Sequence, residues 1–333
     1  MNYRAALAWL FGTQRFGIKL GLESSHRLFE SLSVAAPPGK VIHVAGTNGK
    51  GSVCAVLDAI GRAAGYRTGL FTSPHLVTFR ERIQINGEMI SEEAVARGLT
   101  SIRDLVSTWD AHPTFFEIAT ALALLHFREA GLDLLILETG MGGRLDSTNA
   151  IQATVSVLTP IDYDHQKWLG HTLKEIAGEK AGIIKAGIPV VSAVQPAEAS
   201  QIIRTKAAEQ GSPLRFVDSP MTRFPIALIG EHQKENAALA VAAFQAAQVS
   251  VSEDAIERGL AEVRWPARFQ RWDERTVIDG ANNPAGARVL AHACRATCGG
   301  RKPTVTPADP PDKDGAGLPE PRASPGLHSG GGL

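Results

Sequence analysis

A lysine surrounded by glycines follows a short apolar stretch near the start of the chain. Residues 41–53 read VIHVAGTNGKGSV, so Lys50 lies between Gly49 and Gly51 and is followed two positions later by Ser52. Glycines let a backbone turn tightly with successive N–H groups pointing inward, and the lysine adds a cation. These residue types, between a predicted strand and a predicted helix, are typical of a loop that binds the phosphates of a nucleotide.

The strict phosphate-loop pattern is not met, because it requires glycine at position 44 and serine or threonine at position 51. The chain has Val44 and Gly51 at these positions, and its hydroxyl comes one residue later, at Ser52. The alternative interpretation is a glycine-rich turn with a solvated lysine. We favour phosphate binding, because an apolar strand pattern precedes the loop and an apolar helical pattern follows it.

Further polar side chains follow other predicted strands. Glu138 comes directly after the predicted strand 133–137, and a carboxylate beside a phosphate loop can hold Mg²⁺. His165 follows another strand, and a neutral imidazole can bind a metal, although a lone histidine is more often structural. Ser73 could add a hydroxyl ligand. Lys180 lies in a predicted helix, where the local pattern alone indicates a solvated side chain.

Strand and helix patterns alternate along the chain. Continuous apolar strands between amphipathic helices predict a mostly parallel sheet covered on both faces, with ligands bound beyond the carboxyl ends of the strands. The predicted strands are 41–45, 66–71, 133–137, 154–158 and 188–192, and the predicted helices are 52–64, 91–107, 115–130 and 172–181.

Composition indicates an ordinary globular protein. The chain has 333 residues, is 44% hydrophobic and carries 34 basic and 34 acidic residues. The balanced charge gives no reason to expect binding to nucleic acid or to an anionic membrane. The sequence has no apolar run near the roughly 20 residues of a membrane-spanning helix, so we expect a cytoplasmic protein. Cys294 and Cys298 could be half of a metal site, but no partner pair is present.

The C-terminal part differs in composition from the rest. We place a domain boundary near residue 262, before WPARFQRW and a predicted strand at 275–280. The segment 291–333 contains 8 glycines and 7 prolines. Such a composition predicts a low-complexity, disordered tail.

Eight ordered motifs resemble one known family. They read HVAGTNGKGS, FTSPHL, RIQING, ETGMGGRLDSTN, DH…LG, EKAGIIK, GEHQKENAALA and DGANNPAGA. This series is similar to that of folylpolyglutamate synthase and bifunctional dihydrofolate synthase, in the Mur ligase superfamily. The resemblance implies an α/β fold with a Mur-ligase-like P-loop ATPase domain at 1–262. The start of a Rossmann-like ligase domain at 263–290 would follow, and then the tail at 291–333.

The resemblance also implies an activity. ATP would phosphorylate a carboxylate, and the amine of L-glutamate would attack the acyl phosphate. The acceptor would be the γ-carboxylate of a reduced folate, with dihydropteroate as an additional candidate. We expect these small-molecule partners, no nucleic-acid or membrane partner, and a monomer.

Residue roles are carried over from the family's motifs, position by position. Glu138, His165 and Lys180 would form the catalytic group, with Lys180 carbamylated. One Mg²⁺ would be held by Ser52 and Glu138, and a second by Ser73, Glu138 and His165. The residues implied in ATP or ligand binding are Gly46, Thr47, Asn48, Gly49, Lys50, Gly51, Ser52, Asn236, Arg268 and Asp279.

Two positions depart from the family's motifs. Asn282 stands where the family usually has histidine, and Ala267 stands where it usually has glycine. Together with the composition of the tail, these departures leave a second hypothesis open, a catalytically impaired ATP-binding remnant of such a ligase. A P-loop kinase or motor is disfavoured, because its motif spacing fails and ETGMGGRLD and Lys180 would be unexplained.

Overall fold

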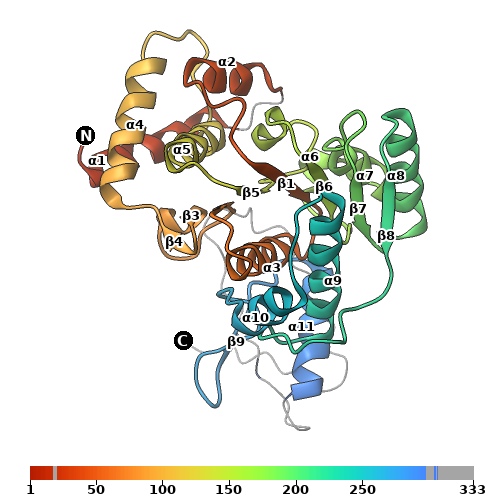
Figure 1. Ribbon diagram of the computed structural model, residues 1–333. Helices are drawn as coiled ribbons and strands as arrows, with labels where there is room; N and C mark the ends of the chain where they lie inside the picture. The colour runs from red at the N-terminus through yellow and green to blue at the C-terminus, as the bar shows by residue number, and fades with distance from the viewer. Residues whose placement is uncertain (18–20, 298–303, 305, 307–333) are drawn as a thin grey trace.

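A mostly parallel sheet forms the centre of the molecule (Figure 1). The computed structural model describes residues 1–17, 21–297, 304 and 306. The eight strands follow the order β4-β3-β2-β5-β1-β6-β7-β8, in which the six from β2 to β8 are parallel and β3 and β4 are antiparallel. Their bounds are β1 Lys40–Ala45, β2 Thr68–Phe71, β3 Ile83–Ile85, β4 Glu88–Met89, β5 Leu134–Glu138, β6 Val155–Leu158, β7 Val190–Ala193 and β8 Leu214–Val217.

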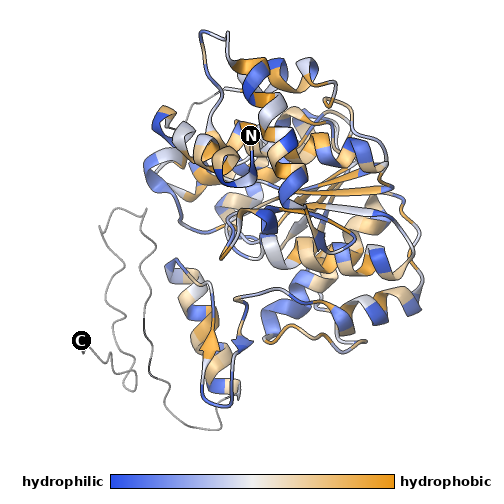
Figure 2. Cartoon of the chain, turned by 90° about the vertical axis from the view of Figure 1, so that its left-hand side faces the viewer, coloured by the Kyte–Doolittle hydropathy of each residue, from blue (hydrophilic) through white to orange (hydrophobic). Residues whose placement is uncertain are grey.

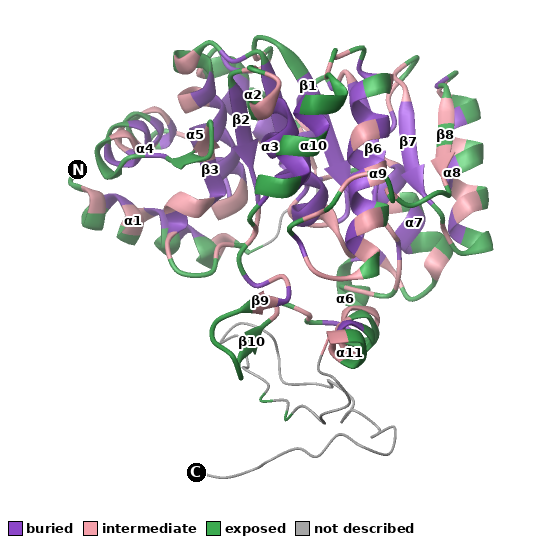
Figure 3. Cartoon of the chain, turned by 60° about the horizontal axis from the view of Figure 1, so that its bottom comes forward, coloured by how far each residue is buried: buried purple, intermediate pink, exposed green. Residues whose placement is uncertain are grey.

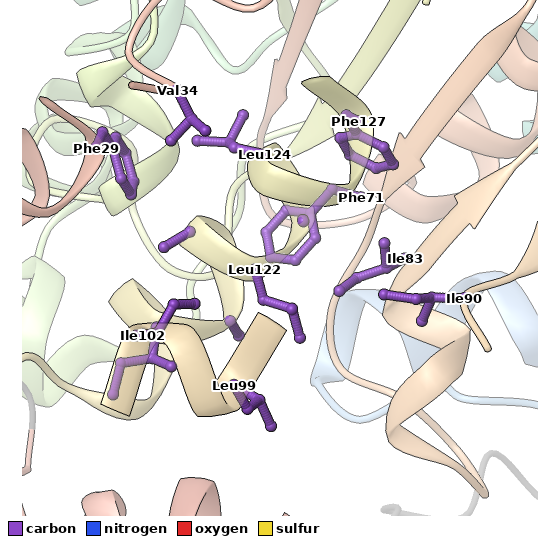
Figure 4. Packing of buried hydrophobic residues seen from close by; sticks show 14 of the residues in the cluster. Phe29, Val34, Phe71, Ile83, Ile90, Leu99, Ile102, Leu122, Leu124 and Phe127 are labelled. Atoms are coloured by element: carbon purple, nitrogen blue, oxygen red, sulfur yellow. The ribbon is translucent and has the colours of Figure 1, made fainter. Parts of the chain in front are cut away.

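Helices cover both faces of this sheet, which is why its central strands are mostly apolar. Ile42 and Val44 of β1 pack on one face, together with apolar side chains of α3, α9 and α10. The other face packs against α1, α2, α4 and α5 (Figure 4). The strands are mostly orange in Figure 2 and purple in Figure 3, as expected for a parallel sheet buried on both sides. The predicted fold class is confirmed.

The helix bounds agree closely with the predicted periodicity. The predicted helix 115–130 is α5, Phe115–Ala130, and the other predicted helices and the five predicted strands of the large sheet match within two residues, whereas β3, β4 and β8 were not predicted. The main helices are α1 Tyr3–Gly12, α2 Glu23–Ser31, α3 Lys50–Ala63, α4 Glu92–Val106, α5 Phe115–Ala130, α6 Gln166–Leu169, α7 Leu173–Ala181, α8 Ala197–Glu209, α9 Glu231–Ala246 and α10 Glu253–Glu262. None of the described helices is long and apolar enough to cross a membrane.

The C-terminal segment lies beside this body, below it in Figure 3. It contains β9 Gln270–Arg271, β10 Val277–Ile278 and α11 Pro284–Thr297. The predicted strand 275–280 is therefore reduced to two residues, which pair antiparallel with β9. The predicted start of the tail at 291 is wrong, because α11 continues to Thr297. Residues 298–303, 305 and 307–333, including Cys298, lie outside the described part, so the rest of the tail prediction is untested.

Candidate functional site

The glycine-rich loop connects β1 to α3 at the carboxyl edge of the sheet. Gly46 and Gly49 have φ values of +145° and +89°, a region that side chains other than glycine rarely occupy. A Cβ at Gly46 would lie 1.9 Å from the hydroxyl oxygen of Thr159, which follows β6. A Cβ at Gly49 would lie 2.6 Å from Oδ1 of Asn236. Both glycines are therefore required by backbone conformation and by close neighbours.

The loop presents unused N–H groups at the start of a helix. The first helical bond of α3 runs from the N–H of Val53 to the carbonyl of Gly49. By helix geometry, the N–H groups of residues 50–52 therefore have no intrahelical acceptor. Together with the partial positive charge of the helix start, these N–H groups can bind an anion such as phosphate.

Two lysine side chains meet at one carbonyl oxygen. Nζ of Lys50 donates to the carbonyls of Gly46 and Thr47, at 3.1 and 3.2 Å. Nζ of Lys180 donates to the same Gly46 carbonyl at 2.9 Å. The local prediction of a solvated Lys180 is wrong, because this residue is only 3% exposed. Burial, and then the charge of Lys50, lower the pKa of Lys180 to about 7, although Asp164 and Asp146 oppose the shift.

A buried carboxylate lies on the neighbouring strand. Glu138 is the last residue of β5, one position later than the predicted strand end, and pairs in register with Val44 of β1. It is 4% exposed, and Oε2 accepts the backbone N–H of Ser73 at 3.0 Å. Burial raises the pKa of Glu138, while the charge of Lys50 is the strongest opposing influence. The structure thus brings the backbone of Ser73 to Glu138, whereas the predicted metal ligand is the Ser73 hydroxyl.

The glycines after Glu138 serve packing within the protein. Gly140 and Gly143 lie in the loop that follows β5. A Cβ at Gly140 would lie 2.5 Å from the ring of Phe116, and one at Gly143 would lie 2.8 Å from the carbonyl oxygen of Lys180. Asp146 holds this loop, because its carboxylate accepts the N–H groups of residues 140, 141 and 148. The loop therefore supports the helix that carries Lys180.

His165 lies near Asp164 with a partly exposed ring. Its φ of +48° is left-handed, its side chain is 40% exposed, and its Nε2 lies 3.9 Å from Oδ1 of Asp164. The described residues contain no group of three or more His, Cys, Asp or Glu side chains that could hold a metal ion. Mg²⁺ commonly uses one or two carboxylates together with substrate phosphates and waters, so a small donor set still fits it. The assignment of Ser52, Ser73 and His165 to metal ions stays a prediction.

The remaining predicted residues lie around the loop and in the C-terminal segment. Asn236 is buried against Gly49 and donates to Gln233 at 3.0 Å. Arg268 donates to the carbonyl of Ala267 at 2.8 Å. The carboxylate of Asp279 accepts the N–H groups of Phe269 and residue 281, at 2.7 and 2.9 Å. Asp279 therefore joins the turn before β9 to the turn after β10, and its role toward a ligand is untested.

Sequence reasoning missed the contact between the C-terminal segment and the loop. Asn283, buried at the start of α11, donates to Oδ1 of Asn48 and Oδ2 of Asp164, at 3.0 and 3.3 Å. Arg288 donates to Asp162 at 3.0 Å. The pattern Asn-Pro could have shown Asn283 as a helix N-cap. No pattern within one element shows which loop its amide contacts.

The unusual Ala267 provides a stability prediction. Its φ of +53° is left-handed, which explains why glycine suits this position. We expect Ala267→Gly to raise the free energy of unfolding by about 1 kcal/mol in denaturant titrations. The matched control is Ala261→Gly, at an exposed position in α10, which should lower it by about 1 kcal/mol. A loss of stability in both variants would show that Ala267 is not strained.

Comparison with known proteins identifies the family of this chain. Residues 44–215 match the family model of the Mur ligase middle domain. The dihydrofolate synthase/folylpolyglutamate synthase of Bacillus subtilis is 38% identical over 327 residues, which cover 88% of this chain and 76% of the relative.

Two solved structures are also similar, with sequence identities that support more than a shared fold. One is a complex of folylpolyglutamate synthase with AMPPCP and folate, with a TM-score of 0.81, 34% identity, and coverage of 89% of this chain and 80% of the other. The second is a bifunctional folylpolyglutamate synthase/dihydrofolate synthase from Yersinia pestis with AMPPNP and a Mn ion. Its TM-score is 0.81 and its identity 35%, and the match covers 89% of this chain and 75% of the other. The chain belongs to the folylpolyglutamate synthase/dihydrofolate synthase family of ATP-dependent ligases.

Proposed function

We propose that this chain joins L-glutamate to the γ-carboxylate of a reduced folate in an ATP-dependent reaction, with dihydropteroate as an alternative acceptor. One observation carries the proposal. Lys50 and Lys180 converge on the Gly46 carbonyl, beside a helix start with free N–H groups and the buried Glu138. This arrangement suits a nucleoside triphosphate and a divalent cation. The related structures above contain ATP analogues, one of them with a Mn ion.

The chemistry needs no nucleophilic side chain. An oxygen of the acceptor carboxylate attacks the γ-phosphorus of ATP, and the bond to ADP breaks. The amine of glutamate then attacks the acyl carbon, loses a proton, and phosphate leaves as the amide bond forms. Catalysis is therefore positioning and charge stabilisation. Lys50 and the N–H groups of 50–52 would bind the phosphates during the first step.

Glu138 is the best candidate to hold a divalent cation. Its carboxylate is buried at the end of β5, where a cation would offset the burial that raises its pKa. Ser52 and Ser73 supply hydroxyl groups at the start of α3 and after β2. A bound Mg²⁺ would neutralise phosphate charge while these residues orient it. His165 would bind a second cation together with Ser73 and Glu138.

We assign carbamylation to Lys180. A pKa of about 7 leaves a large fraction of the amine neutral at physiological pH, as reaction with CO₂ requires. The ammonium first loses one proton; the neutral nitrogen then forms a bond to the carbon of CO₂ and loses a second proton, so the cation becomes an anion. This change replaces the repulsion between Lys50 and Lys180 by an attraction. The carbamate could then interact with a divalent cation as a carboxylate does.

A direct assay tests the proposed function. The full chain is incubated with ATP, Mg²⁺, L-glutamate and tetrahydrofolate or dihydropteroate, and the products are separated by mass. The proposal predicts a product extended by one glutamate, with repeated turnover of ATP to ADP only when both acceptor and glutamate are present. ADP formation without either substrate, and no extended product, would contradict it.

Asn282 favours a second candidate, a chain that binds ATP and turns over poorly. Its side chain is exposed just before α11, at the position where the family's motif usually has an imidazole. We expect Asn282→His to leave the affinity for ATP unchanged and to raise kcat at least tenfold, as a contact made in the transition state would. Turnover of the unmodified chain on the order of 1 s⁻¹ or more, with no gain in the variant, would exclude this candidate.

A further inference from the structure

The amide of Asn283 joins three separate parts of the chain. Asn283 is 6% exposed, and its Oδ1 accepts the N–H of Gly286 at 2.8 Å, so it caps α11. Its Nδ2 points the other way and donates to Asn48 and Asp164. One side chain therefore holds the start of α11, the phosphate loop and the loop after β6 together.

The two loops that Asn283 contacts are already bonded to one another. The N–H groups of Thr47 and Asn48 donate to the carbonyl of Pro160, at 3.0 and 3.2 Å. The hydroxyl of Thr47 donates to the carbonyl of Asp162 at 2.9 Å. A shift of the loop after β6 would therefore move the phosphate loop as well.

Asp164 links this contact to Lys180. Its charge raises the pKa of Lys180, against the larger effects of burial and of Lys50. The hydrogen bond that Asn283 donates to Asp164 fixes this carboxylate in place. It also satisfies an acceptor that is only partly exposed to solvent. Arg288 makes a second contact, with Asp162, but its side chain is 68% exposed, and such ion pairs are weak.

We propose that Asn283 is a positioning residue for the nucleotide site, which sets the phosphate loop and Asp164 from the C-terminal segment. The inference rests on the proposed binding of Mg²⁺-ATP at residues 46–52. An asparagine is needed because it must accept from Gly286 and donate to two oxygens at once. An aspartate could accept but could not donate, and it would place a charge beside Asp164.

The test is Asn283→Asp in the full chain. Aspartate caps helices as well as asparagine does, and its charge suits a helix N-terminus, so α11 should remain stable. We expect the Kd of a non-hydrolysable ATP analogue with Mg²⁺, measured by calorimetry, to rise about tenfold. The lost hydrogen bonds and the new charge beside Asp164 should also lower the melting temperature without nucleotide, so the Kd is measured at a temperature at which both chains are fully folded, where a merely structural role would leave it unchanged.

Asn2→Asp is the matched control, because Asn2 caps α1 with its Oδ1 accepting the N–H of Ala5 at 2.9 Å. It should change neither quantity. An unchanged Kd in Asn283→Asp, or an equal rise in the control, would overturn the inference. Failure of the unmodified chain to bind the analogue would instead contradict the proposed function.

A double-variant cycle covers the case in which Asn283→Asp loses stability. Asp164→Asn combined with Asn283→Asp reverses the direction of the hydrogen bond between these positions. Each single variant should raise the Kd of the analogue by some factor. We expect the Kd of the combined variant to rise by less than the product of these two factors. Losses that simply multiply would show that the two residues act independently, and would contradict the inference.

Discussion

Replacing Lys180 with methionine should abolish ligation and, at the same time, stabilise the folded chain at neutral pH. Lys180 is buried, and its pKa is lowered to about 7, so the folded state disfavours its ammonium form. Methionine fills a similar volume without a charge to desolvate. We expect the free energy of unfolding to rise by roughly 3–5 kcal/mol at pH 6–7 in CO₂-free buffer.

The pH dependence has a defined sign. Between about pH 7 and pH 10 the unfolded chain keeps a proton on Lys180 that the folded chain has lost. Stability rises with pH wherever the unfolded state binds more protons, so this lysine makes the unfolding free energy increase through that window. The Lys180→Met chain should lack this part of the increase. Lys185, whose pKa is lowered to about 8 by burial, contributes in the same direction in both chains.

Activity measurements complete this prediction. Lys180→Ala should lose ligation, and acetate should restore part of it by supplying a carboxylate in place of the carbamate. The matched control is Lys174→Met, at an exposed position of the same helix, which should change neither stability nor rate. Full activity of Lys180→Met, or stability that is unchanged at pH 6–7, would contradict the role given to this residue.

Removing the amine of Lys50 should cause the largest loss of nucleotide binding. In the free loop its ammonium donates to the carbonyls of Gly46 and Thr47, and a bound triphosphate would offer anionic oxygens instead. Hydrogen bonds to charged groups are the strongest in proteins. We expect Lys50→Ala to raise the Kd of Mg²⁺-ATP at least about 100-fold in calorimetric titrations.

Lys40→Ala is the control for this substitution, because Lys40 is exposed at the start of β1, the end of that strand away from the glycine-rich loop. It removes the same charge from the molecule and should leave the Kd unchanged. Equal affinities for the Lys50→Ala chain and the unmodified chain would mean that the glycine-rich loop is a structural turn.

The sheet and its helices could be predicted because their signals are local. Apolar runs at 41–45 and 133–137 become buried parallel strands, and the periodicity of 115–130 gives the helix that the structure shows. The phosphate loop was recognisable for the same reason, since its glycines, Lys50 and the helix start are consecutive. The short β10 was overestimated because RTVIDG has strand composition, whereas only two of its residues find a partner strand.

The burial of Lys180 could not be read from its own helix. It lies in the last turn of α7, and it becomes buried because the loop 140–143 and the Gly46 carbonyl, both distant in sequence, pack around it. Asn283 shows the same limit, since its partners are 235 and 119 residues away along the chain. Such contacts arise from tertiary packing, and only the family resemblance directed attention to Lys180.

The central claim is that ATP activates the acceptor carboxylate as an acyl phosphate. Transfer of a heavy-oxygen label tests this most directly. Tetrahydrofolate labelled in its γ-carboxylate is incubated with the full chain, ATP, Mg²⁺ and L-glutamate, and the released phosphate is analysed by mass. If an acyl phosphate forms, each phosphate carries one labelled oxygen from the carboxylate. Unlabelled phosphate formed together with a glutamylated product would contradict it.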